Sequence, residues 1–301
     1  MRTRNRRTLA AAVAVAALVA VPAVANADGD DDRSSGRHEA DDRRGDDLDA
    51  VGLAAKGTQL VRFSTDDPDD ARKVGTVRGL GGDTFLVGID YRVQDGRLYG
   101  LGNAGGIYTL SDRNARAQKV GQLTVALSGT AFGVDFNPAA DALRVVSDTG
   151  QNLRHPFAGA TAGQTVTDAP LTYPAVPPAT APTPATGVSA AAYTNNDLDA
   201  TTATTLFDLN TVLDQVALQA PANAGTLSPT GLLGVDAAVD AGFDVYSFLR
   251  GGRTVAVDGY ATLTVGGVSA LYEVGLLTGQ ATKVGTFDSA VTDIAIPLGQ
   301  R

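Results

Sequence analysis

Short runs of Val, Ile, Thr, Tyr and Phe alternate with Gly, Asp and Asn along the chain from residue 48 onward. Apolar residues do not recur there at the intervals of an amphipathic helix, whereas β-branched and aromatic runs bounded by turn residues are typical of strands. The pattern therefore predicts an all-β domain over residues 48–301.

One of these runs recurs along the chain. Val87-Gly-Ile-Asp-Tyr91 is repeated as Phe132-Gly-Val-Asp-Phe136, in degenerate form as Ala190-Ala-Ala-Tyr193, and again as Leu233-Gly-Val-Asp236. The aromatic residues that end the first three runs are spaced by 45 and 57 residues. Periods of about 40 to 50 residues with several strands each indicate the blades of a β-propeller.

The order of strands within a unit also repeats. The clearest unit has four strand-like runs joined by tight turns, at residues 87–91, 97–101, 107–110 and 118–121. The last unit echoes this order at residues 270–274 and 281–285. Each unit is therefore predicted to be a four-stranded sheet.

The two ends of the folded part complete one another. Residues 59–63 and 73–77 match the later strands of a unit, and residues 291–296 match a first strand with nothing after it. Pairing the C-terminal strand with the N-terminal partial blade would cover exposed strand edges. We therefore predict a closed propeller of five blades. Six blades are the alternative, because the long intervals leave room for a divergent unit, and a two-layer sandwich would show no fixed period.

The N-terminus has the features of an export signal. Several arginines precede an apolar stretch at residues 9–25, and Ala25-Asn-Ala27 offers small residues to a signal peptidase. The stretch is short and broken by Pro22, which argues against a membrane span. We predict a signal peptide over residues 1–27, with Arg6-Arg7 leaving the Sec and twin-arginine routes open, and a disordered acidic spacer over residues 28–47.

The amino-acid composition excludes several kinds of functional site and argues against two classes of partner. The chain has no Cys, which excludes a thiol nucleophile, a cysteine zinc site and an iron–sulfur cluster. Without residues 1–27 it carries 20 basic and 33 acidic side chains, a net charge of −13. Such a chain is a poor partner for nucleic acid or anionic lipid. We expect a monomer in the extracellular or cell-wall space.

Asp90, Asp135 and Asp236 occupy equivalent places in three repeats, so a ring would set them at similar radius and height. Converging carboxylates could bind calcium through oxygen ligands, and paired carboxylates are what glycoside hydrolysis requires. We favour a structural role, in which each Asp accepts backbone hydrogen bonds, because repeated residues usually serve the repeat. The three residues are retained as candidate ligand-binding groups of the central channel, and no cofactor is predicted apart from the calcium alternative.

Other chemical motifs are incomplete. Asp148-Thr-Gly150 matches the triplet of aspartic proteases, but no second copy exists, so a hairpin turn is favoured. Of the two histidines, His38 falls in the spacer and His155 is interpreted as a loop residue; no Gly-x-Ser-x-Gly elbow accompanies them. Arg144 and Arg154 could bind an anion, although pairing with local Asp residues is the commoner outcome. The Pro-rich residues 170–184 predict an extended loop.

These motifs resemble the bacterial secreted family known as domain of unknown function 4394. The matching segments are residues 87–91, 97–101, 131–138, 144–154, 192–195 and 233–236. The resemblance covers nearly all of the folded part, and the segment from Arg144 to Arg154 is its most specific piece. No activity comes with it, so it implies no catalytic residue.

The sequence therefore favours a non-catalytic binding module for an extracellular protein or glycan. The alternative is a hydrolase or lyase that uses carboxylates at the central channel. It requires at least two of Asp90, Asp135 and Asp236 to face solvent within reach of one another.

Overall fold

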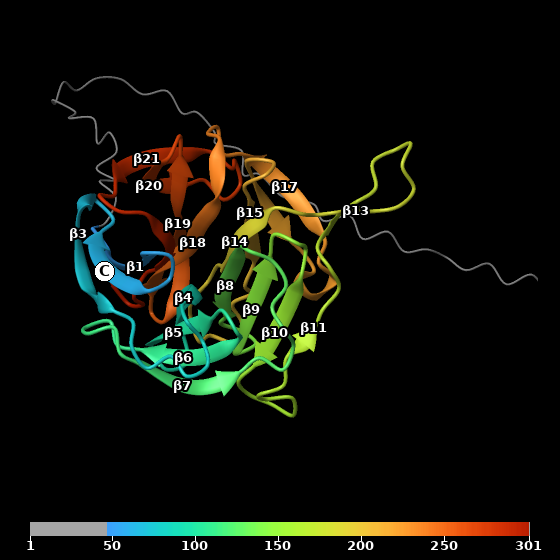
Figure 1. Cartoon of the computed structure of the whole chain (residues 1–301). Coiled ribbons are helices and arrows are strands. Elements are labelled where there is room, and N and C mark those ends of the chain that lie inside the picture. The colour runs from blue at the N-terminus through green and yellow to red at the C-terminus, as the bar shows by residue number, and fades with distance from the viewer. Residues whose placement is uncertain (1–46, 301) are drawn as a thin grey trace, which may run out of the picture. The chain divides into compact units, whose positions relative to one another are not determined.

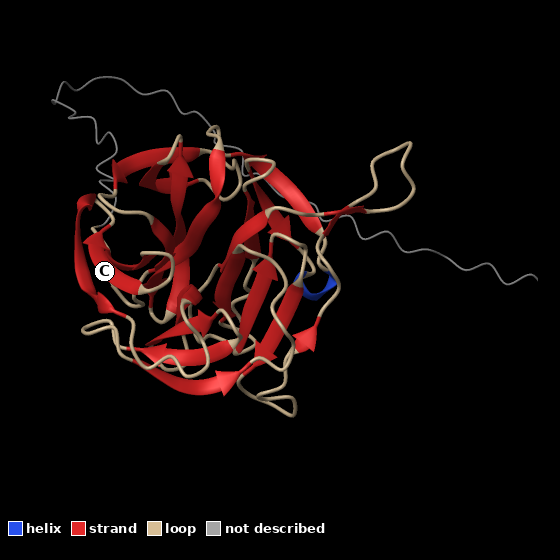
Figure 2. Cartoon of the chain, in the orientation of Figure 1, coloured by secondary structure: helices blue, strands red, loops and turns tan. Residues whose placement is uncertain are grey.

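The computed structural model describes residues 47–300. The predicted signal peptide, and the predicted spacer apart from Asp47, lie outside the described residues. The described chain forms five four-stranded antiparallel sheets arranged as the blades of a propeller (Figure 1). Strands make up most of this part of the chain, and the single short 3₁₀ helix η1 spans Ala222–Ala224 (Figure 2). The prediction of an all-β propeller with five blades is confirmed.

Blades are numbered here in chain order. Blade 1 contains β22 (Val291–Ala295), β1 (Asp49–Ala54), β2 (Gln59–Ser64) and β3 (Asp67–Thr76). Blade 2 contains β4 (Leu86–Arg92), β5 (Arg97–Gly102), β6 (Gly106–Leu110) and β7 (Ala117–Gln122). Blade 3 contains β8 (Phe132–Asn137), β9 (Ala142–Ser147), β10 (Asn152–Pro156) and β11 (Val166–Thr167).

The remaining blades follow the same strand order. Blade 4 contains β14 (Val188–Tyr193), β15 (Leu206–Asn210), β16 (Gln215–Gln219) and β17 (Leu227–Leu232). Blade 5 contains β18 (Ala237–Arg250), β19 (Arg253–Val265), β20 (Val268–Val274) and β21 (Ala281–Thr286). A separate hairpin, β12 (Thr172–Tyr173) with β13 (Thr183–Pro184), stands between blades 3 and 4.

The ring closes through the two ends of the folded part. Strand β22 pairs antiparallel with β1, with Ile294 opposite Gly52 and Asp293 opposite Leu53. Ile294 and Leu60 therefore belong to one sheet, as the complementary sequence fragments predict. The closing strand covers the edge that β1 would otherwise expose.

The five inner strands, β4, β8, β14, β18 and β22, each contact the next around the axis. Glycines permit this close approach. A Cβ atom on Gly133 would lie 2.5 Å from the backbone nitrogen of Ala191, and one on Gly242 would lie 2.3 Å from the Cα of Asp293. Apolar side chains fill the spaces between blades, so strands such as β9 and β14 are buried on both faces. Outer strands such as β7 are largely exposed.

The structure corrects two expectations about single segments. His155 lies on β10 and is buried, rather than sitting in a loop, because Phe157 and Thr165 cover its ring. The Pro-rich segment is not wholly extended, since it contains the β12–β13 hairpin, whose loop projects outward (Figure 1). No helix among residues 47–300 is long and apolar enough to cross a membrane.

Candidate functional site

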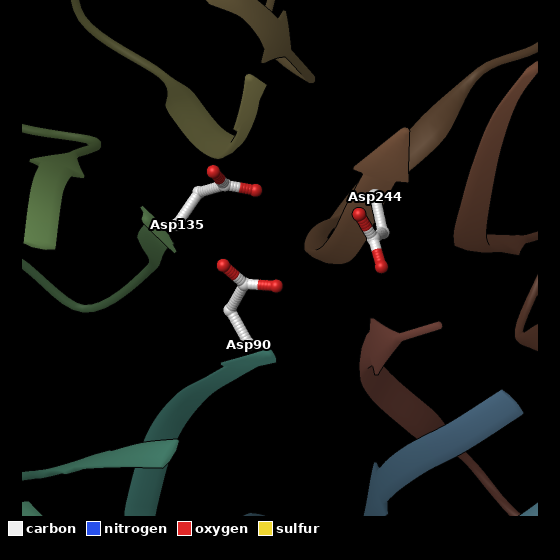
Figure 3. Close-up of side chains that lie close together, drawn as sticks. All are labelled: Asp90, Asp135 and Asp244. Carbon is white, nitrogen blue, oxygen red and sulfur yellow. The ribbon is translucent and has the colours of Figure 1, made fainter. Parts of the chain in front are cut away.

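Three carboxylates converge where the inner strands meet. Asp90 on β4, Asp135 on β8 and Asp244 on β18 each place one carboxylate oxygen within 4.8 Å of the other two (Figure 3). Their exposed fractions are only 6%, 3% and 3%. We call these three residues the hub carboxylates.

The hub contains two of the three predicted residues. Asp90 and Asp135 are brought together, whereas Asp236 is exposed in the turn before β18. The true equivalent in blade 5 is Asp244, which sequence reasoning missed. The signal was present as Gly242-Phe243-Asp244, which repeats the Gly-x-Asp pattern of Gly88 and Gly133. The Leu233-Gly-Val-Asp236 run imitates the motif but precedes the strand.

Backbone hydrogen bonds explain the hub carboxylates. Asp90 accepts the N–H of Phe136 on the next blade at 2.8 Å and that of its own neighbour Tyr91 at 2.6 Å. Asp244 likewise accepts the N–H groups of Ile296 on blade 1 and of Val245, both at 2.6 Å. These bonds tie blade 2 to blade 3 and blade 5 to blade 1.

Asp135 completes the set by accepting the N–H of Tyr193 on blade 4. The five donating N–H groups directly follow Asp90, Asp135, Ala192, Asp244 and Ala295, one in each blade. The three hub carboxylates therefore accept five inward N–H groups. Blades 4 and 1 have Ala192 and Ala295 at this place instead of Asp. In the blade that follows each of them, the Asp accepts the N–H of the residue directly after it. The repeated Asp therefore links each of these blades to the next and stabilises the closed ring.

A fourth carboxylate supports the closing blade. Asp293 on β22 stands at the place that Gly88, Gly133 and Gly242 occupy in three other blades and accepts the N–H of Ile89 at 2.7 Å. Its backbone lies against Gly242, and its side chain lies near Gly88. Asp293 thereby links blade 1 to blade 2, where Ala295 offers no carboxylate.

Burial raises the pKa of every carboxylate in this region. The pKa of Asp244 is raised to about 6, despite two backbone hydrogen bonds that act to lower it. The pKa values of Asp90 and Asp135 are raised well above the ordinary range, first by desolvation and then by repulsion from the neighbouring carboxylates. Desolvation likewise raises the pKa of Asp293. Desolvation and mutual repulsion therefore both favour the protonated form of these carboxylates.

The hub carboxylates could hold a cation, because carboxylate oxygens are the ligands that calcium prefers. Their chemistry as general acid or nucleophile is constrained by burial and by the N–H groups that they already accept.

A separate cavity of about 220 Å³, which we call the axial pocket, is lined by residues of all five inner strands and by none of the hub carboxylates. The pocket includes Phe85, Phe132, Ser189, Asp240 and Thr292 in its wall.

The other sequence candidates have local partners. Asp148 lies in the turn between β9 and β10 and accepts hydrogen bonds from Thr130, in agreement with the hairpin interpretation. Arg144 and Arg154 both pair with Asp168, at 2.7 and 3.2 Å. The favoured interpretation of these two arginines, pairing with a local Asp, is therefore confirmed.

Comparison with known proteins agrees with the repeats. A family model described as "Domain of unknown function (DUF4394)" matches residues 59–295. No curated protein matches the sequence.

Several solved structures are similar to this chain at low identity. A protein from Lactobacillus plantarum has a TM-score of 0.38 and 16% identity over 80% of this chain and 66% of its own. A protein of unknown function from Bacteroides thetaiotaomicron has a TM-score of 0.41 and 12% identity over 84% and 68%. TolB from Acinetobacter baumannii has a TM-score of 0.41 and 9% identity over 84% and 66%. This chain thus spans about two thirds of the length of these proteins.

Proposed function

The chain belongs to the family described as Domain of unknown function (DUF4394), and we propose that it acts as a secreted, non-catalytic binding module for an extracellular protein or glycan. The proposal includes a monomeric protein that leaves the cell by way of the signal peptide expected over residues 1–27. Its binding site is the axial pocket.

The composition of the axial pocket is the observation that carries this proposal. Phe85, whose exposed fraction is 39%, and Phe132 line the pocket together with Thr130, Ser189 and Thr292, whose hydroxyl groups donate within the fold and can still accept from a ligand. An aromatic surface next to a few convergent polar groups is the usual lining of a ligand site. Because the wall is built from five blades of a closed ring, little conformational freedom is lost when a ligand binds.

The charges at the pocket support a polar ligand. Lys56 and Asp240, both exposed, belong to the same wall. A cationic donor and an anionic acceptor near an aromatic face can together recognise a sugar or a polar side chain.

The alternative of a carboxylate-dependent hydrolase is less well supported. Its carboxylates would have to reach a substrate, whereas Asp90 and Asp135 are buried and accept backbone N–H groups from neighbouring blades. The geometry of the hub therefore favours binding over catalysis.

A Phe85→Ala substitution tests the pocket. The secreted chain is applied to a glycan array and to cell-wall material, and the ligand found is titrated against wild type and variant. We expect the variant to lose at least tenfold in affinity while its melting temperature stays near that of wild type, because Phe85 is partly exposed. Leu277→Ala, which truncates a side chain that is 78% exposed on blade 5, is the matched control.

Two results would contradict the proposal. One is the absence of any ligand among glycans and cell-wall components. The other is equal loss of affinity in Phe85→Ala and Leu277→Ala, which would mean that the axial pocket is not the site.

A further inference from the structure

Cationic side chains gather on one side of an acidic protein. Residues 47–300 carry 15 cationic and 25 anionic side chains, a net charge of −10. Two neighbouring grooves at blades 1 and 2, with volumes of about 550 and 520 Å³, share Asp112 in their walls. Six of the fifteen cationic residues line them, Arg62, Arg72, Lys73, Arg97, Arg113 and Arg116, together with four carboxylates, Asp49, Asp67, Asp70 and Asp112. We call the two together the arginine groove.

Most of these cations have no anionic partner. Arg62 pairs with Asp49 at 3.5 Å, and Arg72 pairs with Asp70. The other four are exposed and form no ion pair with any residue that the structure describes. Elsewhere among the described residues, four arginines pair with an Asp and the other five cations form no ion pair.

A buried tyrosine belongs to the wall of the second of these grooves. Tyr91 lines it and is only 6% exposed, and its hydroxyl finds no hydrogen-bond partner among the described residues. Burial raises the pKa of Tyr91; among the charges that act on it, Asp112 raises this pKa further and Arg62 lowers it. The hydroxyl therefore stays protonated, and a ligand that reached it would supply the hydrogen-bond partner that the fold does not.

Neutral polar groups complete the wall. Thr109, Ser111, Asn114 and Gln118 contribute hydroxyl and amide groups. Guanidinium groups recognise carboxylates through paired N–H donors, while hydroxyl and amide groups suit the hydroxyls of a sugar.

We propose that the arginine groove binds an acidic polysaccharide through the carboxylates of its uronate units. The shared chemistry is that of an anionic sugar chain, and a carboxylated chain is favoured because a guanidinium group can pair with a carboxylate through two N–H donors. Two adjoining grooves suit an extended chain better than a single small anion. This site is separate from the axial pocket, and the inference does not depend on the function proposed for that pocket.

The test uses the secreted chain and polygalacturonate. Its fully methyl-esterified form provides the same backbone without charge, and dextran sulfate provides charge without carboxylates. Titration calorimetry should show binding to polygalacturonate that weakens with salt, little binding to the ester, and weaker binding to dextran sulfate.

Variants then locate the site. The double variant Arg97→Ala with Arg116→Ala should lower the affinity by about tenfold to a hundredfold, since charged hydrogen bonds are lost. Arg250→Ala removes an exposed arginine at the tip of the β18–β19 hairpin and should bind like wild type. Tyr91→Phe should weaken binding about fivefold without lowering the melting temperature, because the hydroxyl has no partner in the fold.

The inference is overturned if polygalacturonate does not bind, if the methyl ester binds equally well, or if dextran sulfate is preferred. It is also overturned if the arginine double variant and Arg250→Ala behave alike. None of these results bears on Phe85→Ala, so the axial pocket would be judged separately.

Discussion

The hub and the arginine groove contain charged side chains in opposite surroundings. The hub carboxylates are buried, occur at one repeated position, and accept backbone N–H groups. The arginines of the groove are exposed apart from the partly buried Arg62, occupy positions that do not repeat, and are mostly without ion pairs. The repeated hub carboxylates stabilise the ring, whereas the unpaired arginines of the groove are available to a ligand.

Removing one hub carboxylate should have the largest effect on the free energy of unfolding. Asp244→Ala leaves the N–H groups of Val245 and Ile296 without their acceptor. Each buried, unsatisfied N–H costs about 1–3 kcal/mol, so the free energy of unfolding should fall by about 3 kcal/mol or more. Asp236→Ala, at the exposed position that imitates the motif, should change it by less than about 0.5 kcal/mol. Denaturant unfolding measures both, and equal effects would refute the structural role of the hub.

The pH dependence of stability tests the same carboxylate without removing its volume. The pKa of Asp244 is raised to about 6 in the folded protein, whereas the pKa of an exposed Asp is about 3.9. The folded state therefore holds more protons, so this contribution to stability is complete below about pH 4 and is lost as the pH rises through about 6. A shift of about two units corresponds to at most about 3 kcal/mol.

Asp244→Asn removes that contribution, together with the repulsion by which Asp244 raises the pKa values of Asp90 and Asp135. The variant cannot titrate at this position, so its free energy of unfolding should fall less than that of wild type between pH 4 and pH 8. Burial lowers the pKa of His155 and thereby acts in the opposite direction, but this term is common to both proteins and cancels in the difference. A wild type that gains stability relative to the variant over this window would contradict the account.

The groove is expected to tolerate the loss of its charges. Arg97→Ala combined with Arg116→Ala should change the free energy of unfolding by less than about 0.5 kcal/mol, because neither side chain is buried or paired. Denaturant unfolding alongside Asp244→Ala makes the contrast direct. A loss comparable with that of the hub variant would give these arginines a structural role.

Chelation should have the smallest effect. The hub carboxylates already accept backbone N–H groups, so EDTA is expected to leave the melting temperature unchanged. If calcium instead occupied the hub, chelation would lower the melting temperature, and added calcium would restore it. That outcome would mean that the hub carboxylates bind a metal ion and do not serve only as hydrogen-bond acceptors.

Sequence periodicity predicted most of the fold because each blade repeats the same local pattern. The Gly-x-Asp run located β4 and β8, and the complementary end fragments predicted that β22 joins the sheet of β2 and β3. They missed β1, which lies between β22 and β2. It misplaced the first strand of blade 5, because Leu233-Gly-Val-Asp236 imitates the run eight residues before Asp244. Only the register, which pairs Asp244 with Tyr260 on β19, separates the two.

The candidate sites were less accessible to sequence reasoning because they depend on how different blades meet. Nothing local in the sequence relates Arg62 on blade 1 to Arg97 and Arg116 on blade 2. The partnerless hydroxyl of Tyr91 is equally invisible, since its position in a repeated aromatic run indicates only a buried strand. Packing between blades 1 and 2 brings these groups to one groove.

The most direct test of the account is the affinity for polygalacturonate of a hub variant and a groove variant, measured side by side where both are folded. Asp244→Ala is predicted to bind like wild type despite its lower stability, while the Arg97→Ala, Arg116→Ala double variant is predicted to lose tenfold or more. The reverse pattern, with binding lost from the folded hub variant and retained in the groove variant, would contradict the division between repeated charges that hold the ring and unrepeated charges that bind.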